Sequence, residues 1–341
     1  MENNTITIHD IAKTLEIDSS TVSRALNNSD RVSLKTKKKI LDKANELGYQ
    51  RNLLASNLRK NKTNTIGVVV PRISRHFFSS AISGIEKTAF NKGYNVIICQ
   101  SLEQLEREQN LIDTLAANRV DGVIMSISME TFNYNHLEKL KKNGTPVLIF
   151  DRHCNFSVHS TVLLDDFQGA FEATTHLINQ GCKNIVHFSG PSNLKVYQNR
   201  LQGYKAALEK SNMNFEEKYV LNSHLMNNDG ILLAEKVLKF SEKVDGIFSA
   251  NDVAAISAMQ RFKKAGIRIP EDIAMVGFSN EPISSVIEPA LSTIDQSGSK
   301  MGKIGTELLI EQIKNKSKLA KPEKVIIKPS LLIRESSLRK R

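Results

Sequence analysis

From Thr65 onward, short apolar runs alternate with longer amphipathic stretches, an order that few folds accommodate. Runs such as TIGVVV, DGVIMS and PVLIF are each followed by a stretch with helical periodicity. This order is typical of parallel strands that are covered by helices. Since the pattern comes in two successive sets, resuming with TVLL, it predicts an α/β body made of two doubly wound parallel-sheet lobes.

The amphipathic stretches indicate where the helices of the body lie, and the order of strands and helices indicates where each lobe begins and ends. They predict helices at residues 79–92, 104–117, 134–143, 168–180, 197–212, 229–240 and 252–265, with a strand near Val220. We assign the N-lobe to about 63–162 plus a C-terminal return near 295–320, and the C-lobe to about 163–292 plus the C-terminal end. In open parallel sheets, ligands bind beyond the carboxyl ends of the strands, so the strand-to-helix loops are the expected site.

Those loops carry aromatic and polar side chains. The candidates for binding a small-molecule effector are Phe77, Phe78, Asp151, Arg200, Asn251 and Ser279. Rings pack on apolar faces, while a carboxylate, an amide or a guanidinium matches hydroxyls or ring nitrogens. Helix capping or ordinary packing explains any one of these residues equally well, but five loops that converge on one cleft favour a ligand site.

The first 62 residues have a different pattern, of three short helices. The first starts at a capping box formed by Thr7 and Asp10, the second is capped by Asp18, and the third runs from the capping Ser33 to Gly48. The predicted inward side chains are Ile8, Ile11, Ala12, Leu15, Val22, Leu26, Ile40, Leu41, Ala44 and Leu47. The pattern therefore predicts a small all-α bundle in front of the body.

The gap between the first two helices has the helix-turn-helix length, in which the second helix enters a major groove of DNA. The candidate DNA-binding residues of this part are Thr7, Ser19, Ser20, Thr21, Ser23, Arg24 and Asn27. Arg24 would discriminate more than the serines, because a guanidinium can bind guanine with two hydrogen bonds. From periodicity alone, a plain bundle with a solvated polar face explains the pattern equally well.

The charge distribution adds weak support for a polyanionic partner. The chain carries +11 overall, and residues 1–62 hold twelve Lys or Arg against seven Asp or Glu. This part of the chain is therefore the densest in positive charge, as expected for a segment that neutralises phosphates. A solvated lysine-rich face at Lys37, Lys38 and Lys39 is the alternative interpretation.

Several motifs together resemble the LacI/GalR family of bacterial repressors. They are D-I-A, S-T-V-S-R-A-L, V-S-x-x-T from Val32 to Thr36, E-L-G-Y at the end of the third helix, and T-I-G-V at the start of the body. The resemblance covers nearly the whole chain and implies a head at 5–50, a hinge helix or linker at 51–62, and an effector-binding and dimerisation body at 63–341. It also implies that a homodimer binds a palindromic operator.

The hinge segment is too short to form a stable helix alone, so its order must come from a partner. In the resembled family it folds on DNA and inserts a leucine into the minor groove, which bends the duplex. By this resemblance the DNA contacts of the hinge are Ala55, Asn57, Leu58 and Arg59. A basic flexible linker is the alternative.

The chain departs from the family at two positions. Glu16 stands where the family usually has a glycine in the turn, so it requires a left-handed backbone or a rearranged turn. Ser279 in G-F-S-N-E-P stands where the family often has an aspartate that binds a sugar hydroxyl. Either the effector is not a simple neutral sugar, or Asn280 and Glu281 take over from that carboxylate. We therefore expect a sugar or a sugar derivative without assigning which one.

Other functions have less support in the sequence. We expect no cofactor, no metal site and no catalytic centre, because P-loop, G-x-G-x-x-G and H-E-x-x-H motifs are missing and the three cysteines lack paired spacing. An enzyme with a doubly wound fold is thus disfavoured. A transport receptor is disfavoured by the helical head and by an N-terminus without a signal-peptide pattern. We expect a cytoplasmic protein that does not bind membranes.

Overall fold

The computed structural model describes residues 6–49, 62–152, 159–315 and 322–339, and the chain divides into two compact units. The first unit, Met1–Thr63, is called the head below, and the second, Asn64–Arg341, is called the body. The predicted hinge, with Ala55, Asn57, Leu58 and Arg59, lies outside the described residues.

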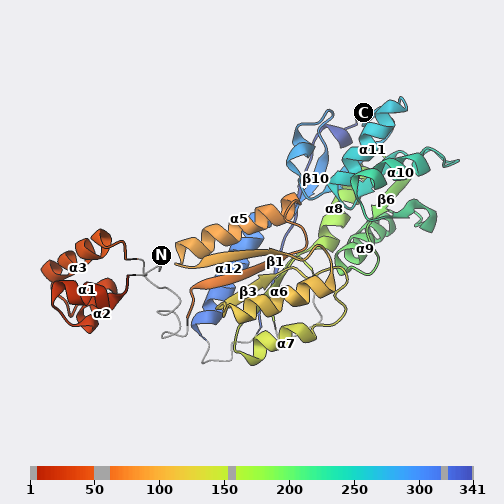
Figure 1. The fold of residues 1–341 in the computed structure, drawn as a ribbon. Coiled ribbons are helices and arrows are strands. Elements are labelled where there is room, and N and C mark those ends of the chain that lie inside the picture. Colours follow the sequence, from red (N-terminus) through yellow and green to blue (C-terminus); the bar gives the residue numbers. More distant parts are fainter. Residues whose placement is uncertain (1–5, 50–61, 153–158, 316–321, 340–341) are drawn as a thin grey trace. The chain divides into compact units, whose positions relative to one another are not determined.

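Helices α1 (Ile8–Leu15), α2 (Ser19–Leu26) and α3 (Leu34–Glu46) form the head (Figure 1). All the predicted caps are confirmed. The Thr7 hydroxyl accepts a hydrogen bond from the Asp10 amide, and the Asp10 carboxylate accepts one from the Thr7 amide at 2.7 Å. Asp18 and Ser33 accept hydrogen bonds from the first turns of α2 and α3 at 2.6 and 3.2 Å. The caps fix where each helix begins.

The core of the head corrects one prediction, the burial of Leu41, and one alternative interpretation, the exposure of Lys37. Ile11, Val22, Ile40 and Ala44 are among its buried residues, but Leu41 is 47% exposed, because it lies one residue beyond Ile40 and so on another side of the helix. Lys37 is also not part of a solvated face. It is buried, and its ammonium donates to the Asn28 side-chain oxygen at 3.0 Å and to the Asn28 backbone oxygen at 3.4 Å.

The turn after α1 has the strained geometry that the sequence predicts. Glu16 has φ 54° and ψ 43°, in the left-handed region, and its amide donates to carbonyls of the last turn of α1. A side chain raises the energy of this backbone conformation, which glycine adopts freely.

Glu16→Gly is therefore expected to stabilise the head by about 1 kcal/mol, because it removes this strain. Hydrogen exchange of the α1 amides in the full-length protein measures the change. Lys38→Gly, at an exposed position inside α3, is the matched control and should destabilise the head by about 1 kcal/mol. Slower exchange in both variants, or faster exchange in both, would contradict the strain at Glu16.

The first sheet of the body has the strand order β11-β5-β4-β3-β1-β2, and all its neighbouring strands are parallel. Its strands are β1 (Thr65–Val70), β2 (Asn95–Gln100), β3 (Gly122–Met125), β4 (Val147–Phe150), β5 (Ser160–Leu164) and β11 (Lys324–Ile327). The helices that pack on it are α5 (His76–Asn91), α6 (Leu105–Ala117), α7 (Asn135–Lys142) and α12 (Gly298–Lys314). This is the N-lobe.

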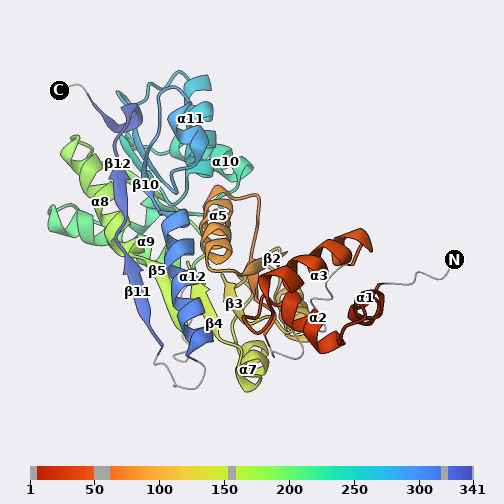
Figure 2. The same cartoon turned by 90° about the vertical axis from the view of Figure 1, so that its left-hand side faces the viewer.

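Both faces of this sheet are covered, which explains its continuous apolar strands. Ile66 and Val68 of β1 belong to a core with Ile85 of α5 and Leu309 of α12. Val69 belongs to a separate core on α6 and α7. Figures 1 and 2 show α5 and α12 side by side, apart from α6 and α7.

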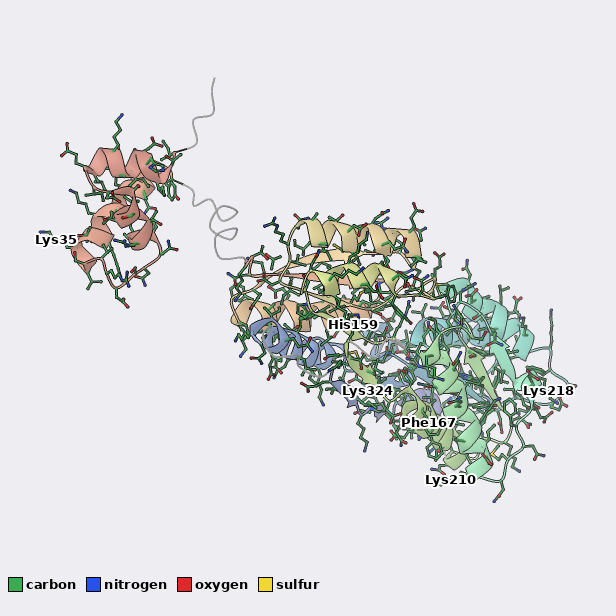
Figure 3. All side chains as sticks on the ribbon, turned by 90° about the horizontal axis from the view of Figure 1, so that it is seen from below. Lys35, His159, Phe167, Lys210, Lys218 and Lys324 are labelled. Carbon is green, nitrogen blue, oxygen red and sulfur yellow. The ribbon has the colours of Figure 1, made fainter. Side chains whose placement is uncertain are left out.

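The second sheet, in the C-lobe, has the order β12-β10-β9-β8-β6-β7, and only the β10–β12 pair is antiparallel. Its strands are β6 (Ile185–Ser189), β7 (Val220–Asn222), β8 (Gly246–Ser249), β9 (Ala274–Phe278), β10 (Ser292–Asp295) and β12 (Ser330–Leu332). The helices are α8 (Asp166–Asn179), α9 (Lys195–Lys210), α10 (Asn227–Val237) and α11 (Asp252–Lys264). Short 3₁₀ turns lie at Glu217–Tyr219, Pro282–Ser285 and Glu335–Ser337. Figure 3 labels Phe167 on α8 and Lys210 on α9, two helices in contact.

The chain passes between the lobes after β5, after β10 and after β11. The strand at Ser160–Leu164, which the sequence pattern placed at the start of the second set, belongs to the first sheet, because it pairs with β4 and β11. The C-terminal return to the N-lobe extends beyond residue 320, to β11, before β12 joins the second sheet (Figure 2).

Candidate functional site

A cavity of about 360 Å³ lies in the body, beyond the carboxyl ends of strands from both lobes. All six predicted effector residues line it: Phe77, Phe78, Asp151, Arg200, Asn251 and Ser279. We call it the main cavity. Its size and its mixture of rings with a few charged groups suit a small polar molecule.

Asp151 follows β4 in a left-handed conformation, with φ 68°. Burial raises the pKa of Asp151 to about 6, although the guanidinium of Arg152 opposes the shift. Its carboxylate accepts one hydrogen bond, from the Ser126 hydroxyl at 3.2 Å, and lies 3.9 Å from Arg152 Nε. A carboxylate that is only 13% exposed and has so few partners can accept further hydrogen bonds from a ligand.

Arg200 lies in the second turn of α9, because the helix begins five residues before it, rather than at the helix start as the sequence suggested. Its guanidinium is held by Asp166 Oδ1, at 2.6 Å from Nη2 and 2.8 Å from Nε, and by the Ala250 carbonyl at 2.7 Å. It also stacks 3.6 Å from the centre of the Phe278 ring. Arg200 is therefore a rigid part of the wall.

Phe77 and Phe78 form an aromatic wall on the first turn of α5. Their ring centres lie 5.1 Å apart, and each ring lies within 6.4 Å of Phe150. Both side chains are more than nine-tenths buried. They give the cavity an apolar surface of fixed shape.

Asn251 contributes less polar chemistry than its residue type suggests. Its side-chain oxygen caps α11 by accepting from the Ala254 amide at 2.9 Å, and its amide nitrogen donates to the Leu225 carbonyl at 2.9 Å. Both polar atoms are thus engaged within the protein. Asn251 lines the main cavity chiefly as a structural residue.

The loop after β9 has no carboxylate at Ser279, but Glu281, two residues later, brings a carboxylate to the main cavity. Ser279 has φ 128°, and Asn280 has φ 51°. The Asn280 oxygen accepts from Arg334 at 2.8 Å, and Asn280 is not part of the cavity wall. Glu281 does line the cavity, and its burial raises the pKa of its carboxyl, with His76 and Arg75 opposing the shift. Of the two predicted substitutes, Glu281 is the one in place.

Sequence reasoning missed other residues of the wall. Tyr197 of α9 lines the main cavity, and its burial raises the pKa of its hydroxyl. Arg75 reaches from the N-lobe to the Met226 sulfur of the C-lobe at 2.8 Å. Glu103 also lines the cavity and forms a half-buried pair with Arg152, the loop residue beside Asp151, with contacts of 2.6 and 2.8 Å. No local pattern distinguishes these residues, because their roles depend on how the two lobes meet.

In the head, α2 presents the predicted DNA-reading side chains. Ser20, Arg24 and Asn27 are exposed, while Ser19, Thr21 and Ser23 are half-buried. Thr7 is exposed and caps α1. The hydrogen bond from the Ser20 hydroxyl lowers the pKa of Asp18. Of the side chains of α2 that can donate hydrogen bonds, Arg24 is the longest, and it is exposed.

The described residues contain neither a metal-binding cluster nor a helix that could cross a membrane. In them, no group of three or more His, Cys, Asp or Glu side chains could hold a metal ion. None of their helices has the length and apolar character needed to cross a membrane. Cys99 and Cys182 carry free thiols.

Comparisons with known proteins agree with this architecture. Residues 7–52 match the family described as bacterial regulatory proteins, lacI family, and residues 63–335 match the periplasmic binding proteins and sugar binding domain of LacI family. The ribose operon repressor of Halalkalibacterium halodurans is 32% identical over 310 residues, which cover 91% of each chain.

Solved structures show the same fold. The lac repressor dimer bound to operator and an anti-inducer has a TM-score of 0.87 at 23% identity, covering 98% of this chain and all of that one. A LacI-type regulator from Alkaliphilus metalliredigens in complex with D-xylulofuranose is 29% identical, with a TM-score of 0.69, and covers 81% of this chain and all of that one. The protein belongs to the LacI family of bacterial regulatory proteins, and it is a DNA-binding transcription repressor with an effector-binding body.

Proposed function

We propose that this repressor binds a palindromic operator as a homodimer and that a sugar or a sugar derivative in the main cavity controls its affinity for DNA. The observation that carries the proposal is the convergence of all six predicted effector residues on one cavity lined by both lobes. A dimer is needed because one helix-turn-helix head contacts a single half-site.

The chemistry of the main cavity supports a polyhydroxylated effector. Asp151 and Glu281 face the cavity from opposite lobes and can each accept hydrogen bonds from hydroxyl groups. Phe77 and Phe78 supply an apolar surface for a ring. A similar regulator binds D-xylulofuranose, and a relative is named for the ribose operon.

Contacts across the cavity suggest how the effector acts. Arg75 contacts Met226, and the Asn193 amide donates to the Met129 carbonyl at 3.2 Å, so both contacts join the N-lobe to the C-lobe. An effector that binds the closed arrangement more tightly than an open one stabilises closure. Closure then changes the spacing of the two hinge segments, residues 51–62, in the dimer. The effector and DNA therefore affect each other's affinity reciprocally.

We propose that this protein binds its effector without changing it chemically and that it acts in the cytoplasm. The polar groups of the main cavity bind and orient a ligand, and we assign them no bond-breaking role. We place the protein in the cytoplasm, because its head requires access to DNA.

The dimer surface that we propose lies on α5 and the edge strand β2. Phe90, Ile97 and Ile98 are 73%, 39% and 42% exposed there, and β2 ends the sheet order. An exposed apolar edge strand is a surface for another chain. We expect the double variant Phe90→Asp, Ile98→Asp to weaken dimerisation about 100-fold, equivalent to roughly 3 kcal/mol.

Analytical ultracentrifugation measures this loss. The matched control is Ile326→Asp, since Ile326 is 54% exposed on β11, at the opposite edge of the same sheet. It should leave the dimer intact. A dimer that resists the first variant and dissociates in the second would place the interface at β11.

Gly190→Ala is expected to weaken effector binding about tenfold or more. A methyl group at this position would lie 2.5 Å from the Tyr197 ring, so the ring must move and the wall of the main cavity changes shape. Titration calorimetry with a sugar that binds the wild-type protein measures the change. Gly305→Ala, where the nearest atoms are side-chain ends of Leu148 and Val162, is the control and should bind normally. Equal affinity in all three proteins would contradict the role of Tyr197.

Electrophoretic retardation of the DNA upstream of the gene for this protein tests the proposed function. Retardation should weaken steeply as salt is raised, because lysines and arginines displace counterions from phosphates. Adding sugars and sugar phosphates in turn should change the affinity for at least one compound. Retardation that no such compound alters would contradict the proposed effector class.

A further inference from the structure

A second cavity of about 250 Å³ opens beside the main cavity. We call it the side cavity. Met129, Arg152 and Leu194 line both cavities, so the two cavities adjoin at these residues. One wall of the side cavity comes from the loop after β3, and the other from the start of α9. It is therefore a continuation of the effector cleft between the lobes.

The wall after β3 is held rigidly although it has no regular secondary structure. Glu108, which is fully buried, accepts hydrogen bonds from the Ser128 amide at 2.6 Å, the Thr131 hydroxyl at 2.9 Å and His136 at 2.9 Å. Glu103 accepts another from the Met129 amide at 2.9 Å. Ordering an irregular loop costs conformational entropy, and such fixed loops commonly carry binding residues. The side cavity is thus a preformed feature.

The lining of the side cavity combines aromatic and polar groups. Phe132 is 75% exposed on its rim, and Tyr134 is half-buried beside it. On the opposite wall, the Asn193 and Gln198 amides donate to backbone carbonyls at 3.2 and 2.8 Å, so their oxygens remain available as acceptors, and Lys195 adds a donor. An exposed aromatic side chain with several hydrogen-bonding groups suits the ring of a sugar.

We propose that the side cavity is a second subsite, which binds the second ring of a disaccharide whose first ring occupies the main cavity. This inference rests on the proposed function, because it assumes a saccharide effector. The linkage between the rings would lie against Met129, Arg152 and Leu194, which both cavities share. Phe132 would then cover the second ring and provide much of the preference for two rings over one.

Titration calorimetry of the full-length protein tests the subsite, with glucose and ribose as one-ring probes and maltose, cellobiose and trehalose as two-ring probes. We expect at least one disaccharide to bind ten times more tightly than either monosaccharide. Phe132→Ala should remove most of that advantage, since it deletes the exposed aromatic ring on the rim of the side cavity. Lys195→Ala, at an exposed position of the opposite wall, should reduce that advantage independently.

A fluorescence measurement reports on the same site directly. The chain contains no tryptophan, so Phe132→Trp introduces a single reporter at the rim. Its emission should change when a disaccharide that binds the wild-type protein is added, and it should not change when glucose is added. Leu34→Trp, at an 83% exposed position in the head, is the matched control and should respond to neither sugar.

Three results would overturn the second subsite. The first is equal affinity for one-ring and two-ring probes. The second is a Phe132→Ala variant that loses the same factor of affinity for both kinds of probe. The third is that none of these sugars binds. The DNA retardation experiment separates these from a failure of the proposed function, because DNA binding without an effector does not depend on the side cavity.

Discussion

Arg200→Met is expected to destabilise the body by about 3–5 kcal/mol, because it leaves the Asp166 carboxylate buried without its partner. Both side chains are only 5% exposed, and the guanidinium also binds the Ala250 carbonyl. Urea unfolding followed by circular dichroism measures the loss. The same variant should not bind the effector, since Arg200 lines the main cavity.

A double variant separates the two roles of this arginine. In Arg200→Met, Asp166→Leu, no unpaired charge remains, so most of the lost stability should return while effector binding stays absent. Lys139→Met removes an exposed ion pair with Asp113 and should change stability very little. If the double variant were no more stable than the single one, packing and not the buried charge would explain the loss.

Arg24→Ala is expected to weaken binding to the preferred operator about 10- to 100-fold, or 1–3 kcal/mol. The reason is that an arginine on the recognition helix can form two hydrogen bonds with a guanine, and Arg24 is the exposed arginine of α2. Fluorescence anisotropy with the operator and with unrelated DNA measures the change in specificity.

The matched control for Arg24→Ala is Arg107→Ala, which removes an exposed arginine from α6 of the body. It should leave both affinities unchanged. An equal loss on operator and unrelated DNA in Arg24→Ala would mean that Arg24 contacts phosphates and does not read a base.

Local signals predicted the helices of the head, because caps act over three or four residues. Thr7 with Asp10, Asp18 and Ser33 each start a helix where the sequence indicates. Local signals failed where a contact outside the helix decides the burial of a side chain. Lys37 looks like a surface lysine, but the fold brings the Asn28 oxygens within reach of its ammonium.

The same distinction applies to the cleft. Position after a strand, together with the family resemblance, was enough to find Phe77, Asp151 and the other predicted lining residues. The sequence named both Asn280 and Glu281 as substitutes for the missing carboxylate, and the choice of Glu281 could not be predicted, because it depends on the path of the loop. That path is held by contacts distant in sequence, from Asp252 to the Glu281 amide at 2.8 Å and from Arg334 to Asn280.

The most direct test of the central claim is selection of binding sites from a random DNA library by the full-length protein. We predict that selection yields a palindrome of two half-sites, as two heads related by dimer symmetry require. The selected sequence should also lose its preferred guanine when Arg24→Ala is used. Enrichment of single half-sites would contradict the dimeric operator complex, and no enrichment of any sequence would contradict a sequence-specific repressor.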